Sequence, residues 1–177
     1  NWETVSYVAG STNQALDSQG LRAACNLSEG TTIILGETAL IRATLTQTAM
    51  SAESVFSTSP NQLSQIACSG TDDAWAVGKS PVLFRLNSKG LTSINLPTDL
   101  IPNTVRFFDN RLWVVGSTTS KRGYLISSDD LGETWEDRTP SGSSALTDLG
   151  MSSGTGWLVG YSGRIYATGD GGETWNE

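Results

Sequence analysis

Two carboxylates, Asp130 and Asp170, are the first candidates for chemistry, because each lies in the same short motif. The stretches "SSDDLGETW" (127–135) and "ATGDGGETW" (167–175) repeat Asp-x-Gly-x-Thr-Trp with the two Asp residues 40 positions apart. Two carboxylates could supply the acid and the base or nucleophile of a glycoside hydrolase. The same Asp in both copies favours instead a side chain that accepts backbone N–H groups within a tight turn.

The composition excludes most other catalytic arrangements. The sequence contains no His, which removes Ser-His-Asp and Cys-His nucleophile pairs and a common metal ligand. We therefore expect no metal site and no cofactor. The net charge is −7 with eleven scattered Lys and Arg residues, which argues against a nucleic-acid partner. No run of eighteen apolar residues is present, so we expect no transmembrane segment.

The motif belongs to a longer repeat. An apolar run ends in Gly36, Gly78, Gly116 and Gly160, at steps of 42, 38 and 44 residues, and each Gly precedes a turn and an alternating strand. One four-stranded sheet per roughly 42 residues is typical of a propeller blade. We expect an all-β fold, a β-propeller domain or propeller fragment over residues 1–177 with about four antiparallel blades. The expected repeats are approximately 10–56, 57–97, 98–140 and 141–177, with 1–9 as a leftover outer strand.

The tryptophans fall into two classes. Trp75, Trp113 and Trp157 each lie three residues before the repeated Gly, and we expect them to pack between blades, with a sugar-stacking surface as the alternative. Trp135 and Trp175 close the Asp motif and should cover its hairpin. Gly132 and Gly172 should supply the positive φ of that turn.

These residues carry a resemblance to a known repeat. Ser128, Asp130, Gly132, Thr134 and Trp135 match the Asp-box, or BNR repeat, as do Thr168, Asp170, Gly172, Thr174 and Trp175. With the "WxVG" stretches upstream, the pattern resembles propellers of the photosystem II stability/assembly factor type. It is also similar to the Asp-box propellers of sialidases, other glycoside hydrolases and sorting receptors. The resemblance implies the propeller fold and a structural role for the motif.

The number of blades in the complete ring stays open at this point. Residues 1–9 could complete the last blade and close a four-bladed ring. Alternatively, the chain is an excised piece of a six- to eight-bladed ring, or associates with a second copy. Trp2 and Trp175 occupy the same position in the motif and should belong to different blades. This favours the excised piece, or association with a second copy, over a closed four-bladed ring.

Cys25 and Cys68 lie eleven and ten residues before their repeated Gly, and so occupy equivalent places on the innermost strands of adjacent blades. They could form a disulfide, or remain two small buried thiols. The acidic, Lys-poor and Ser/Thr-rich composition is typical of extracytoplasmic proteins, and we expect a periplasmic, lumenal or extracellular location.

Partner binding is expected on the loops of one ring face. The turns between second and third strands carry Lys79, Lys121, Arg122, Tyr161 and Arg164. We hypothesise that Lys79, Lys121, Arg122 and Arg164 contact an acidic or carboxylate-bearing partner; ordinary solvated turn charges are the alternative.

The leading functional interpretation is a non-catalytic scaffold that binds a protein, either an assembly factor or a component of a surface structure. The alternative is a carbohydrate-binding or sialidase-like glycoside hydrolase propeller. The chain lacks a recognisable arginine trio and the Arg-Ile-Pro signature of sialidases, since "GRIYATG" (163–169) is the nearest stretch.

Overall fold

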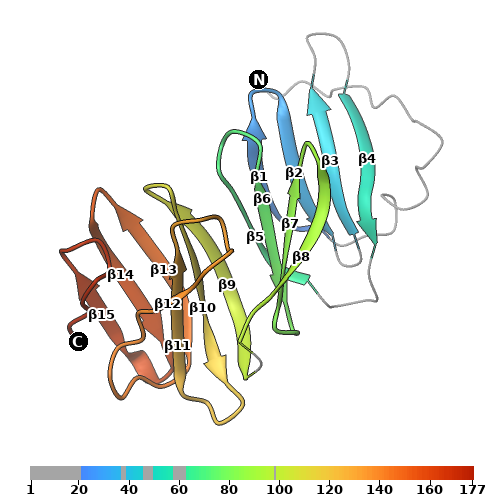
Figure 1. The fold of residues 1–177 in the computed structure, drawn as a ribbon. Helices are drawn as coiled ribbons and strands as arrows, with labels where there is room; N and C mark the ends of the chain where they lie inside the picture. The colour runs from blue at the N-terminus through green and yellow to red at the C-terminus, as the bar shows by residue number, and fades with distance from the viewer. Residues whose placement is uncertain (1–20, 37–38, 46–49, 58–62, 98) are drawn as a thin grey trace.

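The structure is a computed structural model that describes residues 21–36, 39–45, 50–57, 63–97 and 99–177 (Figure 1). Within these ranges the regular structure is β-strand, apart from one 3-10 turn at Tyr161–Gly163. The prediction of an all-β fold is confirmed. The expected outer strand at 1–9, with Trp2, lies outside the described residues.

The strands form four antiparallel sheets, each in chain order. The first sheet contains β1 (Leu21–Ser28), β2 (Thr31–Gly36), β3 (Ala39–Leu45) and β4 (Met50–Ser57). The second contains β5 (Leu63–Cys68), β6 (Ala74–Gly78), β7 (Val82–Asn87) and β8 (Gly90–Asn95). The third contains β9 (Leu100–Phe108), β10 (Arg111–Thr118), β11 (Gly123–Ser128) and β12 (Glu136–Asp137). The fourth contains β13 (Leu146–Ser152), β14 (Thr155–Gly160) and β15 (Ile165–Thr168).

An isolated antiparallel bridge joins Ala167 of the last sheet to Asn176. The four sheets stand in a row, in which β1 contacts β5, β5 contacts β9, and β9 contacts β13. The first strand of each sheet therefore lines the inner side of the row. The first and last sheets lie at opposite ends (Figure 1), so the described sheets form an open arrangement of propeller blades.

Side chains of the second strands alternate between the two neighbouring sheets, as the period of a strand requires. In β6, Ala76 packs toward the first sheet, while Trp75 and Val77 pack toward the third. In β10, Val114 packs toward the second sheet and Trp113 toward the fourth. Each hydrophobic core is consequently shared by two sheets, which makes the stability of every blade dependent on its neighbours.

The repeated glycines lie where the second strand approaches a bulge in the first strand. Gly36, Gly78, Gly116 and Gly160 all pair beside a register shift in their own sheet. A Cβ atom on Gly116 would lie 2.2 Å from the carbonyl oxygen of Ile101. A Cβ atom on Gly160 would lie 2.9 Å from the carbonyl oxygen of Ala145, so a close backbone approach requires Gly at both of these positions.

Cys25 in β1 and Cys68 in β5 form a disulfide, with Cα atoms 5.7 Å apart. The two residues lie on the first strands of adjacent sheets, which are close enough on the inner side of the row for the bond to form. The disulfide covalently joins the first two blades.

The interpretation of the second-strand tryptophans needs one correction. Trp75 and Trp113 are buried between sheets, at 0% and 1% exposure, and Trp75 stacks on Phe107 with ring centroids 5.0 Å apart. Trp157 is 64% exposed. The physical reason is its position on the outer face of the last sheet, where no further sheet stands within the described part of the chain.

Candidate functional site

The two Asp motifs form hairpins with the same hydrogen bonds; we call residues 128–135 and 168–175 the motif hairpins. Asp130 Oδ1 accepts from the Ser128 hydroxyl at 2.7 Å and from the Thr134 backbone N–H at 2.8 Å. Its other oxygen accepts from the Thr134 hydroxyl at 2.5 Å. The Ser128 hydroxyl oxygen accepts from the Gly132 N–H at 2.7 Å. Residues Thr168, Asp170, Gly172 and Thr174 repeat all four bonds.

These bonds stabilise the ionised carboxylates. The Thr134 hydroxyl and backbone N–H, together with Ser128, lower the pKa of Asp130 to about 2. The equivalent bonds from Thr174 and Thr168 lower the pKa of Asp170 as well. A general acid needs a raised pKa to hold its proton near neutral pH. Both Asp residues are therefore suited to locking a turn rather than to proton transfer.

The aromatic residue of each motif covers its hairpin and reaches the core beneath. Trp135 is half-buried against the core shared by the second and third sheets, and Trp175 against that of the third and fourth. Gly132 and Gly172 have φ of +101° and +83°. The motif hairpins thus join neighbouring sheets in addition to closing their own.

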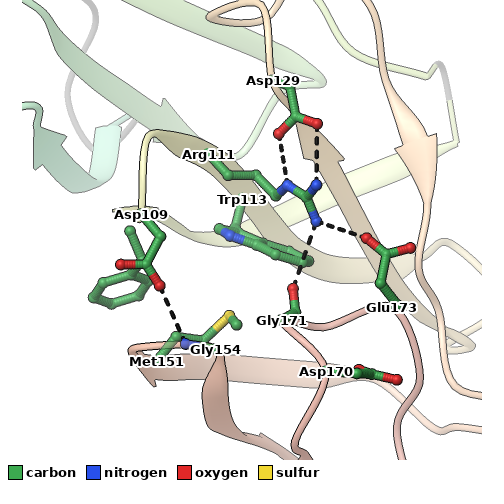
Figure 2. Close-up of a pocket in the computed structure, with 10 residues that line it drawn as sticks. Asp109, Arg111, Trp113, Asp129, Met151, Gly154, Asp170, Gly171 and Glu173 are labelled. Atoms are coloured by element: carbon green, nitrogen blue, oxygen red, sulfur yellow. Dashed lines mark hydrogen bonds and ion pairs between the residues drawn. The ribbon is translucent and has the colours of Figure 1, made fainter.

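An arginine network connects the two motif hairpins (Figure 2). Arg111 donates to both oxygens of Asp129, at 2.6 and 3.0 Å, and to Glu173 Oε1 at 3.0 Å. Its guanidinium carbon lies 5.6 Å from the ring centre of Trp113. The bonds to Asp129 and then Glu173 raise the pKa of Arg111. Arg138 also pairs with Glu173, so the third and fourth sheets are joined by two cations.

A cavity of about 300 Å3 opens beside this network and is lined by acidic residues from both hairpins. Asp129 and Glu173 are held by Arg111, Asp170 is held within its motif, and Asp109 accepts from the Gly154 N–H at 3.4 Å. Within the described residues, no group of three or more His, Cys, Asp or Glu is arranged to hold a metal ion. These contacts favour a structural role for the cavity walls.

A second cavity, of about 530 Å3, lies at the opposite ends of the strands, where the second-to-third turns meet the connections between sheets. We call it the ring-face groove; its lining residues are Ile101, Ser117, Thr118, Thr119, Lys121, Ser144, Ala145, Tyr161 and Ser162. Ile101 and Tyr161 are 38% and 61% exposed. The groove therefore offers two apolar side chains, one cation and several hydroxyl groups.

Backbone bonds hold the groove walls together. The Lys121 carbonyl accepts from the Ala145 N–H at 3.0 Å, and the Ala145 carbonyl accepts from the Tyr161 N–H at 2.9 Å. The backbones of Arg122 and Ser144 pair as an isolated antiparallel β-bridge. Turns of the third and fourth sheets are consequently fixed to one connecting segment, and these backbone bonds position Lys121 and Tyr161 at the groove.

The structure brings together only part of the predicted partner-binding set. Lys121 and Tyr161 line the ring-face groove, and Arg122 lies next to it in sequence. Arg164 pairs with Glu177. Lys79 is exposed on the turn of the second sheet and does not line the groove. Their role in partner binding stays a prediction.

Sequence reasoning did not single out Ile101 as a member of the groove. This residue lies within β9, whose other apolar side chains are mostly buried. It alternates with the buried Leu100 and Pro102 along the strand, and so points away from the core. An apolar residue before Pro102 in "DLIPN" (99–103) was the available signal, since Pro interrupts a strand ladder.

The fold matches solved β-propellers. The WD40 propeller domain of Doa1 superimposes with a TM-score of 0.69 at 8% identity, covering 90% of this chain and 54% of that structure. YCF48 from Cyanidioschyzon merolae gives 0.64 at 16% identity, covering 89% and 55%. A structure described as YCF48 bound to D1 peptide gives 0.55 at 13% identity, covering 90% and 68%. The chain is therefore similar in fold to β-propellers.

No protein-family model and no curated protein sequence matches the chain. The chain spans about half the length of the first two structures that it resembles. Within the described residues, no helix has the length and apolar character needed to cross a bilayer.

Proposed function

We propose that the chain is a non-catalytic scaffold of the Asp-box propeller type that binds a peptide segment of a partner protein in the ring-face groove. The observation that carries the proposal is the grouping of Ile101, Tyr161 and Lys121 around one cavity. Tyr and exposed aliphatic side chains are common anchors of protein interfaces. Lys121 has no ion pair among the described residues, so its ammonium is available to a partner carboxylate.

The ligand class follows from this lining. An extended segment with one apolar side chain beside one carboxylate would place the apolar group between Ile101 and Tyr161, and the carboxylate near Lys121. The Ser117 hydroxyl lines the groove and could bond the peptide backbone, whereas those of Thr118 and Ser144 already bond the groove walls. The YCF48 structure with a D1 peptide shows that another propeller of this fold holds a peptide, and supports the choice of ligand class.

The test is a binding measurement on a peptide array, followed by fluorescence polarisation with the peptides retained. We expect Lys121→Glu and Tyr161→Ser each to weaken binding roughly 10-fold or more. Lys79→Glu makes the same charge change outside the groove and should alter the affinity less than twofold. The assignment of this groove would be disproved if Lys79→Glu weakened peptide binding as much as the groove variants do. It would also be disproved if neither groove variant changed the affinity.

The carbohydrate alternative predicts a different outcome. A glycan array combined with a glycoside hydrolysis screen separates it from peptide binding. Binding of glycans without peptides would replace the scaffold proposal, whereas turnover of a glycoside would make the chain an enzyme.

We also propose that the protein works in an oxidising, extracytoplasmic compartment. The Cys25–Cys68 disulfide supports this location, because disulfides persist mainly outside reducing compartments. Thiol labelling of the protein in fractionated cells tests it. Cysteines that are labelled without prior reduction would contradict the proposal.

A further inference from the structure

The third sheet carries a longer turn on the ring face than the other sheets. In the first, second and fourth sheets, the second strand ends at the repeated Gly, which is Gly36, Gly78 or Gly160. In the third sheet, β10 continues past Gly116 to Thr118 before the chain turns. Extra residues in one repeat often form loops on the binding face of a repeat protein. The extra residues that line the ring-face groove are Ser117, Thr118, Thr119 and Lys121.

This turn has the backbone bonds of a three-residue hairpin loop. The Thr118 carbonyl accepts from the Lys121 N–H at 2.9 Å, and the Thr118 N–H donates to the Arg122 carbonyl at 2.9 Å. Lys121 has φ of +64°. Such a loop consists of a type I turn followed by one left-handed residue, a position that favours Gly or Asn. A lysine at this position lowers the stability of the turn, because its Cβ atom crowds the backbone.

Lys121 gains no packing in return. Within the described residues, the left-handed positions without Gly hold two long side chains, Leu131 and Lys121, and otherwise Asp, Asn or Ser. Leu131 packs against the core shared by the second and third sheets. The Lys121 side chain is exposed and makes no ion pair in the described part of the chain. The contacts of the turn therefore do not explain why a lysine stands there.

The surrounding backbone holds Lys121 in this conformation. Its carbonyl accepts from the Ala145 N–H at 3.0 Å, which ties the turn to the segment before the fourth sheet. An unfavourable backbone conformation persists only where neighbouring contacts fix it, and such positions gather at binding sites. The ammonium group, which is directed to solvent and partners rather than to this turn, is the remaining reason for a lysine at this position.

We infer that Lys121 is the residue by which the ring-face groove selects carboxylate-bearing peptide segments over uncharged ones, at the expense of the stability of its turn. The inference rests on the proposed function. Ile101 and Tyr161 offer apolar surface to charged and uncharged segments alike, so they supply affinity without this discrimination. Among the described residues that line the groove, Lys121 alone carries a charge. Discrimination between a carboxylate and an amide therefore depends on it.

The experiment compares two matched peptides on the full chain and its variants. One is a peptide retained from the array with a single Asp or Glu, and the other has Asn or Gln at that place. We expect the wild type to bind the acidic peptide at least threefold more tightly at low salt, and high salt to reduce this preference. Lys121→Asn should bind the two peptides equally, whereas Lys121→Arg should keep the preference.

Urea denaturation of the same variants measures the effect on stability. Asn tolerates the left-handed region, so Lys121→Asn should lower the equilibrium constant of unfolding roughly two- to fivefold. Lys121→Arg should leave it within about twofold of the wild-type value. Ser153→Asn is the matched control, because Ser153 has φ of +51° and does not line the groove. It should stabilise the protein similarly and leave the affinity for both peptides unchanged.

Failure of this inference can be told apart from failure of the proposed function. A wild type that binds no peptide, or whose binding is unchanged by Tyr161→Ser, would disprove the proposed function and this inference with it. Binding that depends on Tyr161 but does not distinguish the two peptides would overturn this inference alone, as would a preference that survives in Lys121→Asn. A Lys121→Asn variant that is no more stable than the wild type would also overturn it.

Discussion

Gly172 of the second motif hairpin lies against the indole ring of Trp113 in the preceding sheet. A Cβ atom at Gly172 would come within 2.5 Å of the Trp113 Cη2 atom. The glycine therefore serves two purposes, because it also has φ of +83°. A turn that looks local in the sequence is part of the interface between the third and fourth sheets.

Substitution at this glycine should show both effects. We expect Gly172→Ala to lower the free energy of unfolding by about 2–4 kcal/mol, from the left-handed φ and from overpacking against Trp113. Gly171→Ala is the matched control: its φ is +77°, and a Cβ atom there would meet nothing within 4 Å. It should cost about 1–2 kcal/mol. Urea denaturation measures both variants, and equal losses would contradict the packing role.

Arg111 should stabilise the protein through the ion pairs by which it joins the third and fourth sheets. We expect Arg111→Ala to lower the free energy of unfolding by about 1–2 kcal/mol, because it removes a bidentate pair and the contact over Trp113. Arg164→Ala breaks the exposed pair with Glu177 and should cost about 0.5 kcal/mol or less. Thermal unfolding at low and high salt checks the prediction, and high salt should reduce the difference between the two variants.

The motif carboxylates should make the fold sensitive to acid. Hydrogen bonds hold the pKa of Asp130 at about 2 and lower that of Asp170, against about 3.9 in an unfolded chain. The stabilisation is complete above the unfolded value and is lost as the pH falls through the folded value. The free energy of unfolding should therefore decrease between about pH 4 and pH 2.

Asp170→Asn should remove part of this dependence. The variant and the wild type should differ most near neutral pH and converge in strong acid, where the wild-type carboxyl is itself protonated. Denaturant titrations at stepped pH values give the two curves. Parallel curves across the whole range would show that the motif carboxylate does not contribute to acid sensitivity.

The disulfide should stabilise the first half of the chain. We expect the double variant Cys25→Ala, Cys68→Ala to lose about 2–4 kcal/mol of unfolding free energy, because an internal cross-link no longer restricts the unfolded chain. Calorimetry with and without reductant measures the effect. Reductant should lower the Tm of the wild type and leave that of the double variant unchanged; a shift in both would assign the effect to something other than this bond.

Much of the fold follows from local patterns. The repeated Gly, the alternation of the second strand and the Asp motif together predicted antiparallel blades. The last repeat shows the agreement: the strand Thr155–Gly160 ends at the repeated Gly, and the strand Ile165–Thr168 follows after a turn, as the repeat pattern predicted. The motif hairpins could be predicted from the sequence equally well, because their hydrogen bonds join residues two and four apart in the chain.

Which side chains are buried, and which residues meet at the candidate site, depend on contacts between sheets rather than on local sequence patterns. Trp75, Trp113 and Trp157 have the same local pattern, yet only Trp157 is exposed, because burial depends on whether the next sheet is present. The pairing of Cys25 with Cys68 and the convergence of Lys121, Tyr161 and Ile101 on one groove depend on how the sheets are placed beside one another. The sequence by itself determined the repeat, the strands and the turn chemistry, which are short-range. Only the tertiary structure decided which side chains meet between sheets, since those contacts join residues about one repeat apart.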